Sequence, residues 1–299
     1  MARAKASSSR PKSKPAVEEL YFRSDSAYLC VILNRRTGVI RVIDFRSGAL
    51  PAKRLYIQSI AKQEGVTKVL TLVEKDEVSS WTRVGFVREG TIPGFYKRSD
   101  GHLCGCVISD KTASVTVSDD NNRVAEKTIN EAKKNAKEIP DAIRGASISE
   151  ADEKTALAAR DAAWKKEPAL GAFDAFGRDA DRLYLETSMK RGKKNYVHAE
   201  FQDCFGHSLV EVLNAPETES DVLAVTAALR HLGETLKDRG IVSAFSFAPI
   251  DHVGISTAFT AAGYRKTGLL AEMLATPNGR TDAILWTNKL YNPGEEESE

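Results

Sequence analysis

The sequence predicts an α+β protein made of two similar halves, each a mixed, mostly antiparallel sheet flanked by helices. Three observations support this fold class. Short segments rich in β-branched and aromatic residues recur in both halves, as strands require. Each half has one amphipathic helical segment that ends at a glycine, Gly65 or Gly240. A stretch rich in Ala, Lys and Glu separates the halves, and the 299 residues suffice for two domains.

The N-terminal half is predicted to begin with a β-hairpin, because Ala27–Asn34 and Gly38–Phe45 alternate around the polar turn at 35–37. Pro51 then opens a helix, since its fixed φ suits the first helical turn, and the apolar stripe of this helix ends at Gly65. The other elements expected in this half are a strand at Val66–Val73, a short helix through Val78 and Trp81, and strands at Val87–Tyr96 and His102–Ser109.

The stretch between the halves is predicted to contain two helices. Asn122–Glu138 is expected to be an exposed connector, and Ser149 is expected to cap a second helix that runs to Trp164. The predicted layout is therefore a shortened domain at 19–115, a helical connector at 116–148 and a domain at 149–292.

The C-terminal half continues with three strands, a long helix and a second strand–helix unit. The long helix has an apolar stripe, and the shorter helix is expected to be capped by Asp251 and to end at Gly263. The predicted elements, in order, are strands at Arg182–Met189, Asn195–Gln202 and His207–Asn214, a helix at Asp221–Asp238, a strand closed by Pro249, the Asp251 helix, and two strands around the turn at 277–279.

The two ends of the chain differ in charge, although the formal net charge is only +2. Residues 1–18 form a basic tail rich in Ser and Pro, residues 293–299 form an acidic tail, and both are predicted to be disordered. A nucleic-acid-binding arm is the alternative for the basic tail. No apolar run resembles the core of a signal peptide or could span a bilayer, so we expect a cytoplasmic protein without membrane contact.

The four cysteines include the pair Cys104 and Cys106, which stand two apart in an alternating strand-like segment. Both thiols should therefore face the same side of a sheet. No second Cys/His pair at zinc-site spacing accompanies them, so we predict buried thiols and no metal, with a metal or redox site as the alternative.

Three short segments carry a resemblance to a known family: Gly85–Tyr96, which contains Glu-Gly-Thr-Ile-Pro-Gly-Phe-Tyr, then Ala258–Tyr264 and Ala283–Trp286. With the order of the predicted elements, they resemble the GNAT superfamily of acetyl-CoA-dependent N-acetyltransferases, and within it the β-lysine N-acetyltransferase family. The resemblance implies tandem GNAT-like domains, each with three antiparallel strands, a helix, a strand, a helix and two strands. It also implies acetyl transfer from acetyl-CoA to the amine of a small, lysine-like molecule.

In that superfamily a glycine-rich turn before the long helix holds the pyrophosphate of the cofactor with its backbone N–H groups. The corresponding segment here is Glu217–Val222, which has no glycine and three carboxylates. These acids would satisfy the same helix dipole and repel a diphosphate. The positions that the resemblance assigns to the cofactor are Leu213, Ala215, Ser220, Asp221, Val222, Ser256 and Phe259.

Transfer to an amine also needs a base, and Glu211 is the favoured candidate because the resemblance implies a carboxylate at this strand. Alternation places Glu211 on the face of Leu209 and Leu213, and a solvent-exposed strand-edge position is the alternative. Glu200 and His252 are further candidates for the base. The alternative for His252 is a polar loop residue without a catalytic role. Phe259 stands where a proton-donating Tyr is common.

A cationic amine would suit a pocket formed by Glu89, Phe95 and Tyr96, through a carboxylate and aromatic faces. The alternative for these three residues is a strand charge and core packing. The acidic loop keeps a second function open for the whole protein, a catalytically silent GNAT-like domain used for binding or assembly. The acceptor amine and any homo-oligomeric state are not fixed by the sequence.

Overall fold

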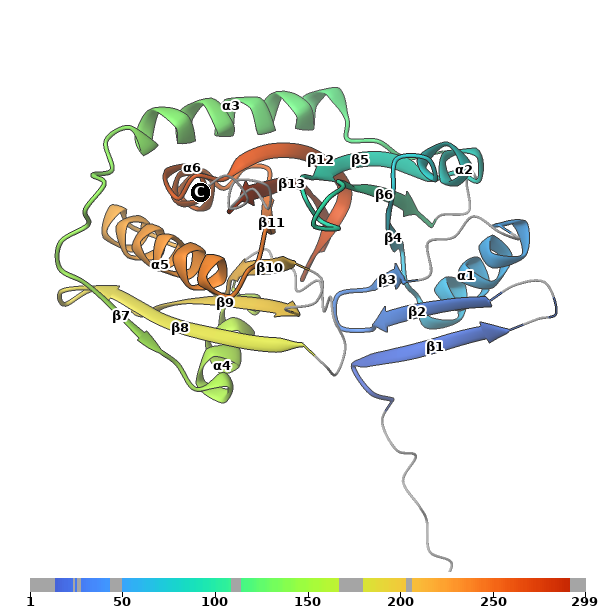
Figure 1. Ribbon diagram of the computed structural model, residues 1–299, viewed down its shortest axis with the longest axis horizontal. Coiled ribbons are helices and arrows are strands. Elements are labelled where there is room, and N and C mark those ends of the chain that lie inside the picture. The colour runs from blue at the N-terminus through green and yellow to red at the C-terminus, as the bar shows by residue number, and fades with distance from the viewer. Residues whose placement is uncertain are drawn as a thin grey trace, which may run out of the picture.

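The computed structural model describes residues 14–23, 25, 28–43, 50–108, 114–166, 180–202 and 206–290. Within this part the chain has six helices and a sheet of thirteen strands (Figure 1). The strand order is β1-β2-β3-β4-β6-β5-β12-β13-β11-β10-β9-β8-β7. Most of the two predicted tails lies outside the described residues, and so does Cys204.

The N-terminal half supplies the first six strands of this order. Its elements are β1 (Val17–Arg23), β2 (Tyr28–Asn34), β3 (Val39–Val42), α1 (Leu50–Glu64), β4 (Lys68–Val73), α2 (Val78–Arg83), β5 (Val87–Ile92) and β6 (Gly101–Val107). Only β3 and β4 pair in parallel, because α1 carries the chain back between them. The edge strand β1 was not predicted, and it includes the last two residues of the segment assigned to the basic tail.

The C-terminal half supplies the other seven strands. Its elements are β7 (Ala146–Glu150), α4 (Glu153–Trp164), β8 (Asp181–Met189), β9 (Asn195–Gln202), β10 (His207–Val212), α5 (Glu219–Asp238), β11 (Ser243–Pro249), α6 (Val253–Ala261), β12 (Arg265–Thr276) and β13 (Gly279–Lys289). Again one pair is parallel, β10 with β11, and α5 connects the two strands.

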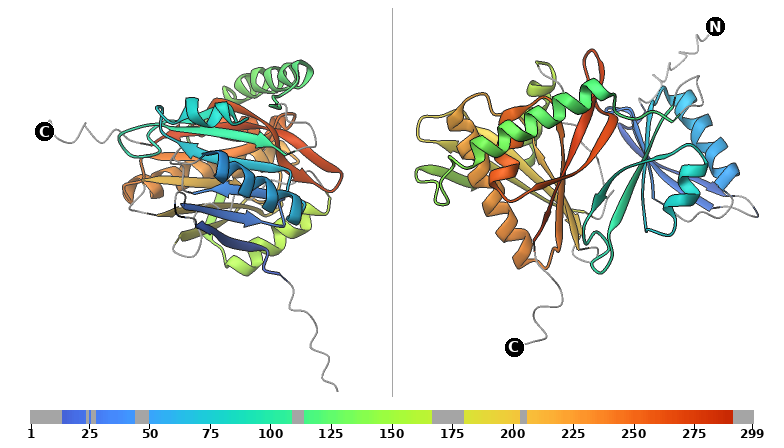
Figure 2. Two further views of the ribbon diagram at one scale, coloured as in Figure 1. Left: turned by 90° about the vertical axis from the view of Figure 1, so that its right-hand side faces the viewer. Right: turned by 90° about the horizontal axis from the view of Figure 1, so that it is seen from above.

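Both halves therefore share one order: three strands, a helix, a parallel strand, a helix and two strands, which β7 and α4 precede in the C-terminal half. The predicted fold class is confirmed, an α+β protein with mixed, mostly antiparallel pairing and helices that flank the sheet. One detail of that prediction changes, because the two halves share a single continuous sheet. The helices α1 and α2 lie on one outer side and α5 and α6 on the other, with the strands between them (Figure 2).

The two halves join where β5 pairs with β12 through Gly90 and Gly268. Each glycine lies five residues after the glycine of a Gly-aromatic pair, Gly85-Phe86 in one half and Gly263-Tyr264 in the other, so equivalent positions of the two halves meet. A Cβ atom on Gly268 would lie 2.4 Å from the Glu89 carbonyl oxygen and 2.6 Å from the Gly90 Cα. Both neighbours are backbone atoms that cannot move aside, so the junction requires glycine.

A buried ion pair lies beside this junction. The Lys68 ammonium donates to both Glu89 oxygens, at 2.7 and 2.8 Å, and to the Ala271 carbonyl at 2.7 Å. The Ala271 N–H in turn donates to Glu89. Since Lys68 and Glu89 come from the N-terminal half and Ala271 from β12, these bonds connect the halves. An apolar cluster shared by the halves lies alongside and includes Leu70, Leu103, Leu209, Phe245 and Leu285.

Three predicted helix features are corrected by the structure. Ser149 lies in β7, and the following helix begins at Glu153 with Asp152 as its cap. The cap of α6 is His252 and not Asp251, because its ring nitrogen accepts the Ile255 N–H. The connector helix α3 (Asp119–Ala136) is not exposed all round, since it lies along α6 and buries Ala125, Thr128, Ile129 and Ala132 (Figure 1).

No described helix is both long and apolar enough to cross a membrane.

The close approach at the junction gives a first prediction. Gly268→Ala should destabilise the protein by about 1–3 kcal/mol, because the added methyl group meets backbone atoms of β5. Gly233→Ala in α5 is the matched control. Its Cβ would meet only the Leu290 Cδ2, at 3.8 Å, so this variant should be neutral or more stable by up to ~1 kcal/mol. Urea unfolding of both variants measures the difference, and equal stabilities would contradict the close approach.

Candidate functional site

The site lies where β10 and β11 separate. These parallel strands pair from His207 with Ser243 to Leu209 with Phe245 and no further, although β10 continues to Val212 and β11 to Pro249. Each strand keeps its other neighbour over its full length. The strands therefore diverge towards their carboxyl ends, where the loops to α5 and α6 begin. Ligands commonly bind at such ends in sheets with a parallel pair.

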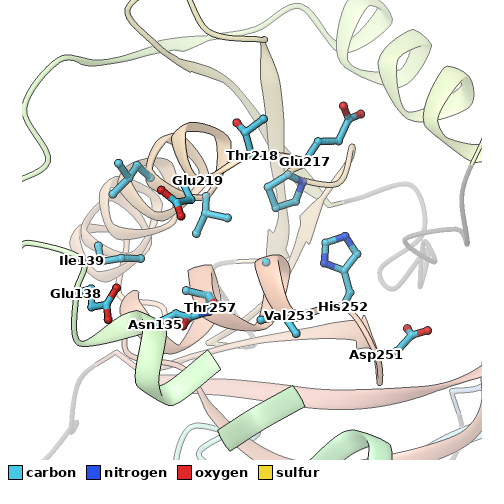
Figure 3. A pocket seen from close by; sticks show the side chains of 14 residues that line it. Asn135, Glu138, Ile139, Glu217, Thr218, Glu219, Asp251, His252, Val253 and Thr257 are labelled. Atoms are coloured by element: carbon cyan, nitrogen blue, oxygen red, sulfur yellow. The ribbon is translucent and has the colours of Figure 1, made fainter. Parts of the chain in front are cut away.

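A pocket of about 870 Å³ opens at these ends (Figure 3). Its walls are the loop and first turn of α5, the first turn of α6 and the end of the connector helix α3. Among the described residues that line it, the charged side chains are all carboxylates and none is a Lys or Arg. The carboxylates are Glu138, Glu217, Glu219 and Asp251, and His252 also lines the wall.

The backbone at the start of α5 is already hydrogen-bonded within the chain. Thr218 caps the helix and accepts the Asp221 N–H, while the Asp221 carboxylate accepts the N–H groups of Glu217 and Thr218, at 3.1 Å each. The Asn195 side chain donates to the same carboxylate. This reciprocal arrangement is a capping box, which satisfies the N–H groups that otherwise remain free at a helix start.

These bonds also set the ionisation of Asp221. Partial burial acts to raise the pKa of its carboxyl group. The hydrogen bonds from the Glu217 backbone, Asn195 and Thr218 outweigh burial and hold the pKa below its ordinary value. The charged form of Asp221 therefore stabilises the folded protein.

Acetyl-CoA, the cofactor that the resemblance implies, does not fit this site. Three of the N–H groups that would hold its pyrophosphate are bonded to Asp221 or Thr218. The wall around them carries four carboxylates, which would repel phosphate groups. Of the positions assigned to the cofactor, Val222 lines the pocket and Ser220 is exposed. The others, besides Asp221, are buried away from the pocket lining: Leu213, Ala215, Ser256 and Phe259.

Glu211, the favoured base, is buried and not at a solvent-exposed strand edge. The His198 ring on β9 donates Nδ1–H to the Glu211 Oε2 at 3.2 Å, because a carboxylate oxygen can only accept. Tyr184 stacks on the His198 ring, with the centroids 4.5 Å apart. The outer atoms of this pair, Glu211 Oε1 and His198 Nε2, are buried without a hydrogen-bond partner among the described residues.

The sequence analysis did not identify His198 as the partner of Glu211. The signal was available in part, since both residues alternate onto the same face and stand opposite each other across β9 and β10. The pair does not line the pocket, because it faces away from α5. Its role as a base stays a prediction.

The two other candidate bases are committed to structural contacts. Glu200 is 3% exposed and forms an ion pair with Arg182 at 3.1 Å. His252 caps α6 through Nδ1, so its neutral ring carries the proton on Nε2. Of the candidate bases, only His252 lines the pocket.

The three predicted substrate residues do not form one pocket. Glu89 is paired with the buried Lys68. Phe95 is covered by the His207 ring, with centroids 3.6 Å apart, and Tyr96 donates its hydroxyl to the Leu72 carbonyl at 3.1 Å. Core packing between the halves, the alternative for Phe95 and Tyr96, is the arrangement found. These residues supply no amine pocket in the described structure.

Of the cysteine pair, Cys104 is buried as predicted, whereas Cys106 is only partly buried. Cys104 is fully buried, and burial raises the pKa of its thiol to about 12. No group of three or more potential metal ligands occurs among the described residues.

No protein-family model matches the chain, and no curated protein matches its sequence. Solved structures match about half of it. The ribosomal-protein-S18-alanine N-acetyltransferase from Escherichia coli shares 18% sequence identity with this chain at a TM-score of 0.36. The match covers 50% of this chain and 97% of the Escherichia coli chain. The spermidine N-acetyltransferase from Vibrio cholerae, in complex with CoA and spermine, shares 8% identity at a TM-score of 0.38, over 50% of this chain and 97% of its own.

The Asp221 contacts give a second prediction. Asp221→Asn should lower the free energy of unfolding by about 1 kcal/mol at pH 7, because the capping box loses its charged acceptor. A carboxyl group whose pKa is lower in the folded protein stabilises the fold at pH values above its unfolded pKa. This stabilisation is lost as the pH falls through the folded-state pKa. The difference between the two proteins should therefore shrink below about pH 4.

Urea unfolding at pH 7 and pH 3 measures this pH dependence. Asp238→Asn is the matched control, because Asp238 is exposed at the opposite end of α5. A negative charge at that end is neutral or slightly unfavourable for the helix, so its removal should leave the stability unchanged or slightly higher. A loss for Asp221→Asn that is the same at both pH values would contradict the charged cap.

Proposed function

We propose that the chain is a catalytically silent GNAT-like protein that binds a small ligand, other than acetyl-CoA, in the pocket between α5 and α6. One observation carries this proposal: the turn that would hold a pyrophosphate has three of its N–H groups bonded to Asp221 and Thr218 and is surrounded by carboxylates. The protein keeps the scaffold and the pocket. Its pocket has the opposite charge from the one that acetyl-CoA needs.

Charge magnitudes support this choice. Two unit charges 4 Å apart interact by about 1 kcal/mol in water and by more near a protein surface. CoA brings several phosphate charges, and the pocket brings Glu138, Glu219 and Asp251 with no ion-pair partner among the described residues. Glu217 is paired with Lys193. The repulsions add, and they would cancel much of the affinity that the rest of the cofactor could supply.

A second candidate function is an N-acetyltransferase that acts on a small, lysine-like amine. The divergence of β10 and β11 favours it, because a gap between these strands could admit an acyl group. The Glu211–His198 pair is the base that this function would use. Glu211 would then hold the ring in one tautomer and His198 Nε2 would accept a proton from the amine.

Thermal unfolding with acetyl-CoA separates the two functions and is the third prediction. The silent protein should show no resolvable rise in Tm at about 1 mM acetyl-CoA. A ligand whose Kd is above its concentration raises the free energy of unfolding by less than about 0.4 kcal/mol. It should also transfer no acetyl group to a panel of small amines. A clear Tm rise at micromolar acetyl-CoA, or turnover that Glu211→Gln abolishes, would overturn the proposal in favour of the acetyltransferase.

A triple variant tests whether the pocket carboxylates exclude CoA. Replacing Glu217, Glu219 and Asp251 together with Gln, Gln and Asn should strengthen CoA binding by roughly tenfold or more, because three repulsions are removed. Glu234→Gln is the control, since Glu234 is exposed near the far end of α5. Unchanged CoA affinity in the triple variant would show that the carboxylates do not exclude the cofactor.

A further inference from the structure

The carboxylates of the pocket come from three separate elements. Glu138 follows α3, Glu219 lies in the first turn of α5 and Asp251 precedes α6 (Figure 3). None of these three makes an ion pair with a described residue. The side chains therefore present negative charge from several sides of one cavity, with no Lys or Arg in its lining.

A buried hydroxyl in the same cavity also lacks a partner. Thr257 on α6 lines the pocket, and its residue is 3% exposed. Its Oγ1 has no hydrogen-bond partner among the described residues. Buried polar atoms are nearly always hydrogen-bonded, so an unpaired one in a cavity wall points to a ligand that can supply the bond.

No three potential metal ligands among the described residues are close enough to share one ion. The cavity of about 870 Å³ has the size of pockets that hold organic molecules of moderate length. Carboxylates that come from three separate elements match a cation whose charges are also separated.

We propose that this pocket binds a linear organic polycation with two or more ammonium groups. Its ammonium groups lie against Glu138, Glu219 and Asp251, and one N–H donates to the Thr257 hydroxyl. The inference rests on the proposed function, in which acetyl-CoA does not occupy the pocket. It gives that function a ligand class, because the same carboxylates that repel phosphates attract ammonium groups.

Isothermal titration calorimetry of the full chain with three amines tests the ligand class and is the fourth prediction. Spermidine should bind more tightly than 1,4-diaminobutane, and 1,4-diaminobutane more tightly than n-butylamine, since each added charge gains a carboxylate partner. The affinity should fall as the salt concentration rises. Equal binding of all three amines, or no binding of spermidine at millimolar concentration, would overturn the inference.

Single variants then locate the site. Glu138→Gln, Glu219→Gln and Asp251→Asn should each weaken spermidine binding roughly three- to fivefold, because each removes one charge partner. Glu234→Gln removes one exposed carboxylate outside the pocket and should leave the affinity unchanged. A loss of affinity in Glu234→Gln equal to that in the pocket variants would show that spermidine binds only the overall surface charge.

The outcomes also separate this inference from the proposed function. A protein that binds neither acetyl-CoA nor spermidine overturns the polycation and leaves the silent scaffold standing. A protein that binds acetyl-CoA at micromolar concentration overturns both. Far-UV circular dichroism and the Tm of each variant in the absence of ligand check that the substitutions have not unfolded it.

Discussion

The close backbone contact between β5 and β12 determines how the rest of the molecule is arranged. Because Gly90 and Gly268 meet without side chains, the sheets of the two halves become one sheet. Their inner faces then pack together in a shared apolar cluster. This packing covers Phe95 and Tyr96 and pairs Glu89 with Lys68, so residues that could have formed a ligand site instead hold the halves together.

The ligand pocket lies at one end of the C-terminal half. The strands β10 and β11 diverge there, and two helices begin. In this chain three N–H groups at the start of α5, those of Glu217, Thr218 and Asp221, are bonded to the side chains of Asp221 and Thr218. A helix start that needs no anion, placed in a wall of carboxylates, is suited to a positively charged ligand. Charge, and not shape, is what separates this pocket from a phosphate site.

Much of the fold could be predicted from the sequence, because periodicity and turn residues mark most elements. The strand at Asn195–Gln202 has the predicted boundaries, and α5 starts two residues earlier than predicted. The edge strands β1 and β7 were missed, since the short β7 is polar and β1 alternates only between exposed and half-buried positions.

The site was harder to predict. The acidic loop was visible in the sequence, but the contacts of Glu89, Phe95 and His198 depend on pairing between distant strands. The single Gly90–Gly268 pairing that joins the halves leaves no local pattern in the sequence from which it could be predicted.

One crystal structure would test the central claim most directly: the full-length protein soaked with acetyl-CoA and spermidine together, each at millimolar concentration. Spermidine density is expected between Glu138, Glu219 and Asp251, with no diphosphate at the start of α5. Density for a CoA pyrophosphate against the Glu217–Val222 turn would contradict it.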